Sequence, residues 1–585
     1  MTSPLETSIE RAVAEWPVVG LGCGVVAAGE PLFARGFGVR RAGSNEAVTE
    51  RTLFAIGSVS KSFTAALVAM LVDEGAIGWD SRVIDHLPKF RVFDPFVTRE
   101  MTVRDLLTHR SGLERGDFMW YKSGYDADEV VRRVAYLKPT WSFRSTFGYQ
   151  NVMYLAAGQL IETLTGKSWD DAIRERIFEP LAMHDSHPSA ATLDKDGDVA
   201  LPHLRLGDRF ERIVSHEGFN MNPAGSIYSN ARDMLAWLQL ALGNGVVGGE
   251  RLLSTGSSEA TRTPQMPMAL SAWSELFPGA EFLSYASGWF VWSYRGLTVV
   301  SHGGNIDGMS AVAAVVPEAG FGIAAFTNVN GSRIPQALVY HAIESTVFNR
   351  PGLWLNEFRE NERIGRERLD YIEEDRKRSR VPNTLPSRPL SVYAGTYGDD
   401  FYGTATVALQ GDRLQFDFIG FRGPLDHWHF DTFTLAIADP YLKTYSPVLR
   451  FDLDDFGQPS QLTLSLLGGV RMPLQRKPEE PLGIDLPIET LRSYEGRYVS
   501  QAAALTIAID FVGTALRASV PGALAGSGEN TIVRELVAVA EDRFAIRSTQ
   551  SELRFGDAGA VTLETPHQLP ITLTKSEPTA RPVRG

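Results

Sequence analysis

A chain of 585 residues is too long for a single hydrophobic core and predicts two to four domains. Its 57 basic and 70 acidic residues give a net charge of −13, and this balance, without a long basic run, argues against nucleic acid or an anionic membrane as the main partner. The single cysteine, Cys23, excludes an intrachain disulfide, and its apolar neighbours predict a buried strand rather than a reactive thiol.

The N-terminal sequence carries no targeting signal that we can identify. Met1 to Glu6 lacks the basic and apolar regions of a secretory signal. No uncharged stretch reaches the length that spans a bilayer. Taking Met1 as the natural start, we expect a cytoplasmic protein.

The first elements in the chain predict part of a sheet and a buried helix. A short helix is expected from Glu6 to Trp16, followed by two strands, Gly20 to Val26 and Pro31 to Val39, which a hairpin turn joins. From Ser62 to about Ala76 apolar residues recur every three or four positions, which predicts a helix buried along one side.

Residues 77 to 250 are predicted to be mostly helical, with helix starts at Thr102, Asp126, Ser168 and Ser229. From about Gly288 the apolar period changes to two, which predicts antiparallel hairpin strands. These strands are Trp289 to Tyr294, Thr298 to Ser301, Ser310 to Val316 and Gly322 to Asn328.

An apolar helix from Ile334 to Phe348 closes this unit. Because its first strands lie near residue 20 and its last near residue 325, we expect both ends of residues 1–348 to share one sheet, with the helical region inserted between them. The predicted fold class of this domain is α+β.

A connecting segment and an internal repeat follow. Residues 349–386 alternate acids and bases between prolines, which predicts a solvated connecting helix. Beyond it, Leu390 to Tyr397 matches Leu491 to Tyr498 at a spacing of 101 residues.

Each copy of the repeat is a series of short alternating strands with glycine turns, which predicts a small antiparallel β-barrel or sandwich. We assign residues 387–480 to the first barrel-like domain and residues 481–585 to the second. The tail from Ser576 is expected to be disordered.

A serine and a lysine stand three residues apart at the opening of the apolar helix. Ser58 and Lys61 share one helix face, so an amine can reach the serine oxygen. The unpaired N–H groups of a first turn also favour negative charge. The pair suits a nucleophile that becomes an alkoxide, although a serine at a helix start with a solvated lysine one turn on has the same pattern.

Two later motifs favour the catalytic interpretation. Tyr149-Gln150-Asn151 precedes a predicted helix from Leu155 to Leu164, and His302-Gly303-Gly304-Asn305 ends a strand. With Ser58-x-x-Lys61, they resemble in order and spacing the three motifs of the serine β-lactamase and penicillin-binding-protein superfamily. Thr102 to Leu113 and Pro223 to Ser229 are similar to the class C β-lactamase-like branch, and the resemblance covers about residues 10 to 348.

The resemblance implies acyl transfer on Ser58. Ser58 would attack an ester or amide carbonyl, and Lys61 and Tyr149 would share the proton. A lysine has an ordinary pKa of about 10.4, and burial, a second cation or a phenol can lower it enough for the amine to act as a base.

The resemblance also implies the groups that hold the substrate. Asn151 is expected to hydrogen-bond Lys61 and the substrate amide. The backbone N–H groups of Ser58 and Asn305 would form the oxyanion hole. Gly303 and Gly304 would let the strand approach the substrate closely, and a plain turn is the alternative interpretation of the two glycines.

His302 departs from the pattern. Related β-lactamases and DD-peptidases have a lysine there, a fixed cation for the substrate carboxylate, whereas histidine is largely neutral at pH 7. The change disfavours carboxylate-bearing β-lactams and resembles the D-aminopeptidases and some esterases of the family. A D-aminopeptidase of this superfamily carries two C-terminal barrels, one of which sends a loop into the active site. The candidate loops here are Gly420 to His429 and Ala438 to Tyr441, either of which could offer an acid to a substrate amine.

Other histidines offer weaker alternatives. His109 suggests a Ser-His-Asp triad, but the chain has no Gly-x-Ser-x-Gly elbow. His184-x-x-His187 and His427-x-His429 have metal-like spacing without a further acid or cysteine cluster. We expect no metal and no cofactor.

The leading hypothesis is a serine hydrolase of the Ser-x-x-Lys type that acts on a small molecule or short peptide, with a D-aminopeptidase-like or esterase-like activity. The alternatives are a non-catalytic binding or scaffold protein that is acylated slowly or not at all, and a true β-lactamase. Neither nucleic acid nor membrane is an expected partner, and a homo-oligomer stays open.

Overall fold

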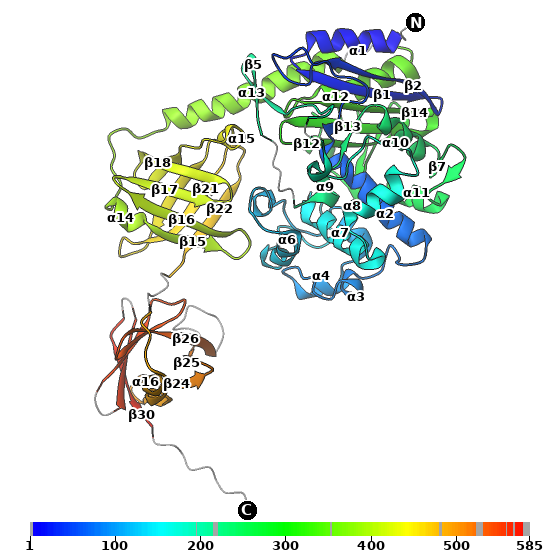
Figure 1. Cartoon of the computed structure of the whole chain (residues 1–585). Helices are drawn as coiled ribbons and strands as arrows, with labels where there is room; N and C mark the ends of the chain where they lie inside the picture. Colours follow the sequence, from blue (N-terminus) through cyan, green and yellow to red (C-terminus); the bar gives the residue numbers. More distant parts are fainter. Residues whose placement is uncertain are drawn as a thin grey trace, which may run out of the picture.

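A central antiparallel sheet of eight strands organises the first domain of the computed structural model (Figure 1). The structure describes residues 4–194, 196–214, 220–350, 354–478, 483–521, 531–556, 559–565 and 568–576. In spatial order the strands are β2 (Glu30–Gly38), β1 (Gly20–Ala27), β14 (Phe321–Thr327), β13 (Met309–Val316), β12 (Leu297–Ile306), β11 (Phe290–Tyr294), β10 (Leu283–Tyr285) and β9 (Met266–Pro267).

The N-terminal and C-terminal strands of this domain pair directly, as predicted. Strand β1 runs antiparallel to β14, with Leu21 opposite Thr327 and Val26 opposite Gly322. Cys23 is fully buried in β1, and burial raises the pKa of its thiol to about 12, so the thiol is inert at neutral pH. The predicted buried strand at Cys23 is therefore confirmed.

Helices cover both faces of the sheet. On one face lie α1 (Pro4–Glu15) and α12 (Ile334–Ala342), and on the other lie α2 (Ser60–Asp73) and α10 (Asp233–Leu242). The remaining helices up to the connecting segment are α3 (Val83–His86), α4 (Pro95–Glu100), α5 (Val103–Leu107), α6 (Ala127–Arg133), α7 (Asn151–Thr165), α8 (Trp169–Ile173), α9 (Asn222–Gly225) and α11 (Thr255–Arg262).

Side-chain caps explain where several of these helices begin. The side chains of Thr102, Asp126 and Ser168 each accept a backbone N–H of the first turn, which satisfies a donor that the helix cannot. Helix α10 begins at Asp233, four residues after the predicted start. The inserted region is less helical than predicted, because it also holds the short strands β4 (His203–Leu206), β5 (Arg209–Arg212), β6 (Tyr228–Ser229), β7 (Val246–Val247) and β8 (Glu250–Arg251). Strand β6 pairs with β3 (Phe54–Ala55), which lies just before the Ser58 turn.

Helix α2 is buried on all sides rather than along one face. Every residue from Ser60 to Leu71 is buried. The ring of Phe63 stacks on Trp237 at 3.7 Å between centroids, and Thr64 Oγ1 donates a hydrogen bond to the carbonyl of Pro223 at 2.7 Å. The prediction of a one-sided helix was wrong because the inserted helices close over the side that the sheet does not cover.

Helix α13 (Trp354–Arg378) leads from this domain to the first barrel and contains the predicted charged connecting helix (Figure 1). Phe358 is its buried anchor, with its ring 5.4 Å from that of Tyr340. Ion pairs between residues three and four apart, such as Arg363 with Glu360 and Glu367, stabilise its exposed part.

The repeat forms two closed eight-stranded antiparallel barrels, which confirms the barrel prediction. The first consists of β15 (Gly395–Asp399), β16 (Gly403–Gln410), β17 (Arg413–Phe418), β18 (Phe421–His429), β19 (Thr432–Leu435), β20 (Val448–Leu453), β21 (Pro459–Ser465) and β22 (Arg471–Arg476), with the short helices α14 (Leu390–Tyr393) and α15 (Pro440–Lys443). The second consists of α16 (Ile488–Ser493) and of β23 (Gly496–Ser500), β24 (Leu505–Val512), β25 (Ala515–Pro521), β26 (Thr531–Ala540), β27 (Arg543–Ile546), β28 (Glu552–Phe555), β29 (Ala560–Glu564) and β30 (Ile571–Lys575).

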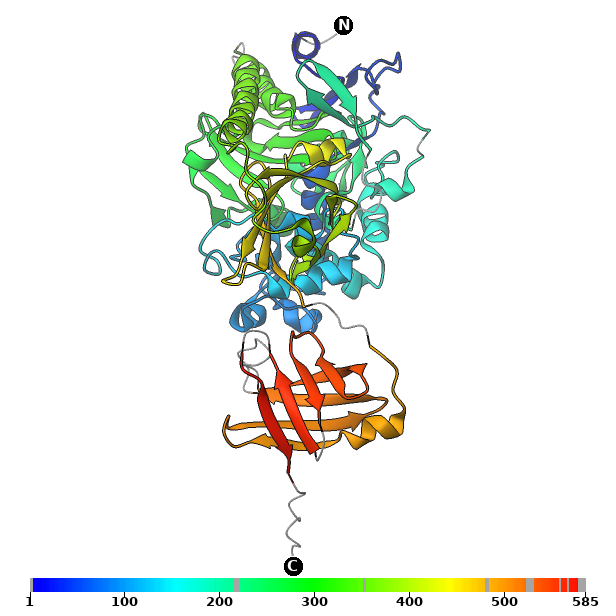
Figure 2. The ribbon, with the colours of Figure 1, turned by 90° about the vertical axis from the view of Figure 1, so that its left-hand side faces the viewer.

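The two barrels relate differently to the first domain. The first barrel packs against it: the rings of Phe118 and Phe421 lie 5.4 Å apart, and Lys122 pairs with Asp439. The second barrel has a separate core and lies apart from the first domain (Figure 2). The predicted disordered tail, from Ser576, lies almost wholly outside the described residues.

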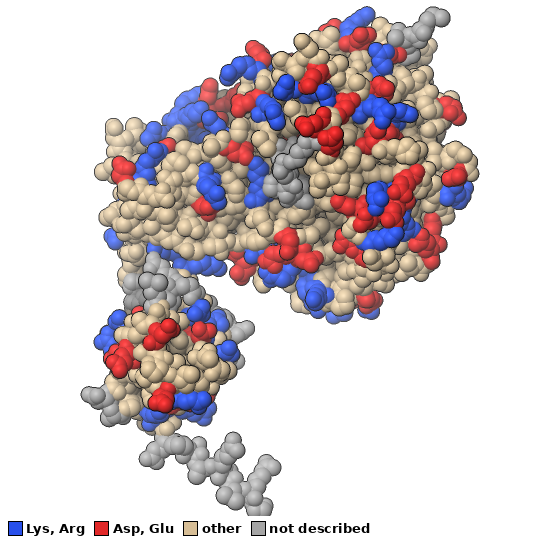
Figure 3. Space-filling model, viewed as in Figure 1, with Lys and Arg blue, Asp and Glu red and all other residues tan. Residues whose placement is uncertain are grey.

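The surface view shows basic and acidic side chains interspersed over the face presented, rather than gathered in a basic field (Figure 3). Of the helices in the described part of the chain, none has the length and apolar character that crossing a bilayer requires.

Candidate active site

Ser58 lies in a tight turn between strand β3 and helix α2. The turn, Gly57–Val59, is a 3₁₀ turn that runs straight into the helix. Gly57 has a positive φ of 51°, and a side chain there would place Cβ 2.9 Å from the backbone nitrogen of Asn305. Glycine is therefore required directly before Ser58. Because Gly57 has no side chain, strand β12 can pack against the turn.

Lys61 is fully buried and points at Ser58. Its Nζ donates a hydrogen bond to Ser58 Oγ at 3.0 Å and another to the carbonyl of Ala224 at 2.7 Å. Burial lowers the pKa of Lys61 well below its ordinary value, the Arg115 cation lowers it further, and Asp117 partly opposes both. The structure thus favours the neutral amine, which can accept the serine proton.

Tyr149 contacts the same serine from the segment before α7. Its hydroxyl is hydrogen-bonded to Ser58, and Lys61 Nζ lies 4.9 Å from the centre of its ring. Burial raises the pKa of Tyr149 above its ordinary value, although Arg115 and the bond to Ser58 act in the opposite direction. Tyr149 is therefore a protonated phenol at neutral pH, and Lys61 is the better base.

Asn151 does not make the bond predicted for it. It is the first residue of α7, and its Nδ2 donates to Asp117 Oδ1 at 2.8 Å instead of to Lys61. Asp117 also accepts from Trp120 Nε1 at 3.0 Å and pairs with Arg115. Asp117, which the motif does not include, therefore fixes the orientation of the Asn151 amide.

The backbone of strand β12 at Gly304 and Asn305 lies directly against the Ser58 turn. Cβ of an alanine at Gly304 would stand 2.0 Å from the carbonyl oxygen of Ile56 and 3.1 Å from the nitrogen of Ser58, so β12 touches the turn through its bare backbone. At Gly303, by contrast, Cβ would meet only the Ala311 carbonyl at 3.7 Å. In the described part of the chain, β12 pairs with β13 from His302 to Ile306, whereas its pairing with β11 ends at Ser301.

His302 is neutral, as predicted, but it does not line the cavity. Its side chain is buried, with Nε2 hydrogen-bonded to the Tyr285 hydroxyl at 3.0 Å and Nδ1 2.6 Å from the carbonyl of Gly303. Burial and the nearby Lys61 lower the pKa of His302 to about 3. His302 therefore holds the end of β12 through its bonds to Tyr285 and Gly303, and it offers no positive charge to a substrate.

His109 is also a buried side chain that packs against the site residues, and it is not part of a Ser-His-Asp triad. It is completely buried, its Nδ1 accepts the N–H of Gln150 at 3.1 Å, and its ring lies 4.2 Å from that of Tyr149. These contacts hold Tyr149 in place. No group of three or more His, Cys, Asp or Glu side chains in the described ranges is arranged to hold a metal ion.

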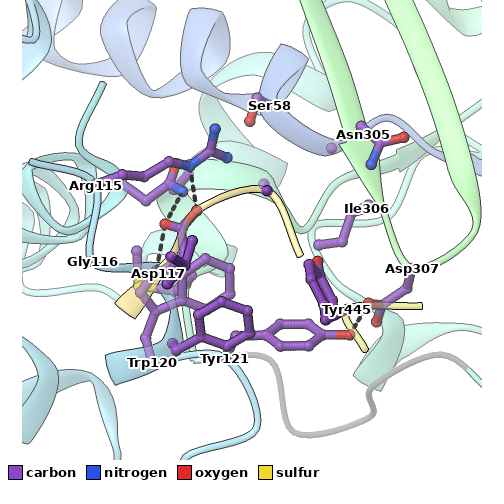
Figure 4. Close-up of a pocket in the computed structure, with 18 of the residues that line it drawn as sticks. Ser58, Arg115, Gly116, Asp117, Trp120, Tyr121, Asn305, Ile306, Asp307 and Tyr445 are labelled. Carbon is purple, nitrogen blue, oxygen red and sulfur yellow. Dashed lines mark hydrogen bonds and ion pairs between the residues drawn. The ribbon is translucent and has the colours of Figure 1, made fainter. Parts of the chain in front are cut away.

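A cavity of about 700 Å³ opens over Ser58, and both the first domain and the first barrel line it (Figure 4). The first domain supplies Trp120 and Tyr121, whose hydroxyl donates to Asp307 Oδ1 at 2.7 Å. The barrel supplies Tyr402, Tyr441, Tyr445 and the turn Gly468, Gly469, Val470 and Arg471. The cavity is wide enough for a substrate larger than a single amino acid.

The two loops predicted to reach the site have different outcomes. Ala438 to Tyr441 contributes Tyr441 to the cavity wall, but its acid, Asp439, is paired with Lys122 and is not offered to a substrate. Gly420 to His429 forms strand β18 and supplies none of the described lining residues. The turn from Gly468 to Arg471 was not predicted, although the glycine pair Gly468-Gly469 marks it in the sequence as a tight turn.

Arg115 and Asp117 were also missed as site residues. They follow Ser111-Gly112-Leu113 in the sequence, where the run Glu114-Arg115-Gly116-Asp117 is the only signal. A short run of alternating charges is more typical of a solvated loop.

A serine bonded to a buried lysine and close to a tyrosine, beside an antiparallel sheet with an inserted helical region, is the arrangement of the serine β-lactamases and penicillin-binding proteins. The chain belongs to the beta-lactamase family, whose model matches residues 5–345. Residues 379–479, which hold the first barrel, match a domain of unknown function, DUF3471.

Named relatives agree with this assignment. The unguisins hydrolase ungD' of Aspergillus campestris is 28% identical over 425 residues, which cover 69% of this chain and 77% of the relative. Penicillin-binding protein 4 of Amycolatopsis lactamdurans is 34% identical over 301 residues, covering 50% of this chain and 76% of the relative. Among solved structures, the octameric penicillin-binding protein homologue from Pyrococcus abyssi has a TM-score of 0.50 at 22% identity and covers 80% of this chain and 99% of its own. This last likeness supports the fold.

Proposed function

We propose that the chain is a serine hydrolase that forms an acyl-enzyme on Ser58 and cleaves a small amide, short peptide or ester. One observation carries the proposal: Ser58 is hydrogen-bonded to both Lys61 and Tyr149 and opens onto a cavity beside two backbone amides. A nucleophile, a base and an oxyanion hole are the groups that acyl transfer needs.

The proton transfers follow from the contacts. Ser58 Oγ attacks the substrate carbonyl and gives its proton to the neutral amine of Lys61. The N–H groups of Ser58 and Asn305 stabilise the negative oxygen that forms. Tyr149 donates its proton to the departing amine or alkoxide and regains one from Lys61, and water then releases the acyl group by the reverse route.

The other predicted residues have supporting roles in this proposal. Gly303 and Gly304 leave the edge of β12 open for the substrate backbone. Asn151, held by Asp117, lines the cavity and can donate its second amide hydrogen to the substrate. His302 fixes the strand end through Tyr285.

A peptide or amide substrate with a D-residue is the first specific candidate, and an ester is the second. The neutral His302 removes the cation that would hold a β-lactam carboxylate at the strand, which disfavours a true β-lactamase. One relative is named as a hydrolase, and this supports turnover over a purely binding role. We include a cytoplasmic location in the proposal, and also a homo-oligomer, since one similar structure is described as octameric.

The test compares Ser58→Ala with Ser62→Ala on D-alanine p-nitroanilide, L-alanine p-nitroanilide and p-nitrophenyl butyrate. Ser62 is the matched control because it lies on the same helix and its hydroxyl is bonded to the carbonyl of Val59 at 2.7 Å. We expect Ser58→Ala to lose about 10⁴-fold or more in kcat and Ser62→Ala to lose little.

Intact-protein mass spectrometry after treatment with a fluorophosphonate separates the alternatives. The absence of an adduct on Ser58 would favour the binding or scaffold protein. Full activity in Ser58→Ala would refute the proposal. Rapid hydrolysis of nitrocefin would favour the β-lactamase alternative. Light scattering measures the oligomeric state.

A further inference from the structure

The active site has a cation that the recognised motifs do not include. His302 stands where related enzymes have a lysine, and it is buried, neutral and turned toward Tyr285. Lys61 itself is favoured in its neutral form. The positive charge closest to the proton-transfer groups in the described structure therefore comes from another element, the segment between Leu113 and the 3₁₀ turn Asp117–Met119.

Arg115 lies on this segment and faces the reacting groups. Its guanidinium carbon is 5.0 Å from the centre of the Tyr149 ring, on which Lys61 Nζ also lies at 4.9 Å. Arg115 lines the cavity with Ser58, and Figure 4 shows it beside Asp117, with which it pairs. Asp117 in turn is fixed by Trp120 and Asn151, so the guanidinium has a defined position.

We propose that Arg115 is a positioning residue that supplies the fixed positive charge of the site in place of a strand lysine, and that it acts through Tyr149 and Lys61. The inference rests on the proposed hydrolase function. A cation beside the phenol and the amine favours the neutral amine and the phenolate, so both groups exchange protons nearer to neutral pH. Its side chain is 61% exposed in the open cavity, and a bound substrate strengthens its effect by displacing water.

Several other charged or ionisable side chains lie around Lys61 and Tyr149 and could contribute to a pH profile. Arg115 lowers the pKa of Lys61 and of Tyr149, and Asp117 raises both. Tyr154 lies with its ring 5.4 Å from Lys61 Nζ, and burial keeps its hydroxyl protonated. Tyr285, which couples to Tyr149, is also kept protonated by burial. The neighbouring His109 and His302 have pKa values depressed by burial and by Lys61, so both are neutral at pH 7.

The test is a charge series at position 115 read as a pH profile. The rate constant kcat/KM for p-nitrophenyl butyrate is measured from pH 5 to 10 for the full chain and for Arg115→Lys, Arg115→Gln and Arg115→Glu. The acidic limb reports protonation of the base. Removing the cation raises the pKa of the base, so the limb moves to higher pH.

We expect Arg115→Lys to retain the wild-type limb, Arg115→Gln to move it up by about 0.5 pH unit, and Arg115→Glu to move it up by about 1 unit. The two distances to the Tyr149 ring place the guanidinium within about 10 Å of the amine, and a unit charge at that range in a half-solvated site has an effect of this order. Activity lost at pH 7 should return at pH 9. A purely structural role would lower the rate at every pH and would not order the variants by charge.

Arg82→Gln is the matched control, because Arg82 is an exposed arginine paired with a nearby aspartate, Asp85, and is not among the described residues that line the cavity. Thermal melting identifies any variant that fails to fold, and either Arg115→Gln or Arg115→Glu alone is enough to test the shift against Arg115→Lys.

Limbs that coincide for all four proteins, or a loss that is equal at every pH, would overturn the role of Arg115. Failure of the hydrolase proposal itself is distinguished separately, since Ser58→Ala would then keep its activity and no fluorophosphonate adduct would form on Ser58 in any variant.

Discussion

Gly304→Ala is expected to separate catalysis from folding at the oxyanion hole. The added Cβ would stand 2.0 Å from the carbonyl oxygen of Ile56, 2.9 Å from its carbon and 3.1 Å from the nitrogen of Ser58. Ordinary contacts between a methyl carbon and backbone atoms are about 3.5 Å or longer. All three neighbours are backbone atoms, so β12 and the Ser58 turn must move apart by roughly 1 Å or more.

That displacement removes the backbone N–H of Asn305 from reach of the oxyanion, since donors must lie within about 2.7–3.1 Å of the oxygen. Loss of one such donor costs about 10²–10³ in kcat, or about 2.7–4 kcal/mol of transition-state stabilisation. The overpacking should also lower the free energy of unfolding by about 1–3 kcal/mol. The variant is therefore expected to fold and to bind substrate while it turns over slowly.

The assay is kcat for p-nitrophenyl butyrate together with the rate of fluorophosphonate labelling of Ser58, each measured on protein whose melting is recorded. Gly303→Ala is the comparison, because Cβ there would meet only the Ala311 carbonyl at 3.7 Å. We expect its kcat to stay within about threefold of the wild type. A folded Gly304→Ala that matches Gly303→Ala in both rates would refute the assignment of the Asn305 amide to the oxyanion hole.

Three further outcomes are expected. Because the pKa of His302 is about 3 in the folded chain and about 6.5 in the unfolded one, the unfolded state binds more protons between these values. The contribution of His302 to the free energy of unfolding should then be complete above pH 6.5, and it should fall by up to about 1.4 kcal/mol per pH unit below that value. Urea unfolding at pH 7, 6 and 5 should show that the free energy of unfolding of His302→Asn depends less steeply on pH than that of the wild type. Equal slopes for the two proteins would contradict this. Lys122→Glu should weaken the contact between the first barrel and the first domain by repelling Asp439, and limited proteolysis should then cleave the chain faster. Adding Asp439→Lys should restore resistance to proteolysis, and a double variant that is cleaved as fast as Lys122→Glu would show that the pair does not hold the barrel in place. A chain ending at Lys477 should keep wild-type kcat, since the second barrel has its own core and supplies none of the described cavity residues; a large loss would show that it acts on the site.

Much of the fold follows from local pattern. The change from helical to alternating period near Gly288 located the C-terminal strands, and the match of Leu390 to Tyr397 with Leu491 to Tyr498 predicted two barrels of one kind. The burial of α2 on all sides could not be predicted, because its neighbours Trp237 and Pro223 lie more than 150 residues away in sequence. The spacing of apolar residues in a helix shows which of its faces must be buried, and it does not show whether other segments of the chain cover the remaining faces.

At the site, the sequence motifs brought Ser58, Lys61 and Tyr149 together as candidates, and the structure places the three side chains in contact. It did not predict the partner of Asn151, since Asp117 reaches that amide only after the chain folds back between α5 and α7. Nor did it show that His302 turns inward, which depends on the hydroxyl of Tyr285 across the sheet. Contacts between distant segments decide these details, and no local pattern encodes them.

The pairing of β1 with β14 also sets an order for synthesis in the cell. Strand β1 leaves the ribosome early, yet its sheet neighbour, around Thr327, follows about 300 residues later. At roughly 5–20 residues per second, the apolar strand around Cys23 waits for tens of seconds without its partner.

The helix that carries Ser58 waits as well, because it packs between that sheet and the inserted helices. Nascent chains of this protein are therefore expected to need protection from aggregation until the last strand of the domain emerges, and the Ser58 turn can reach its final surroundings only then.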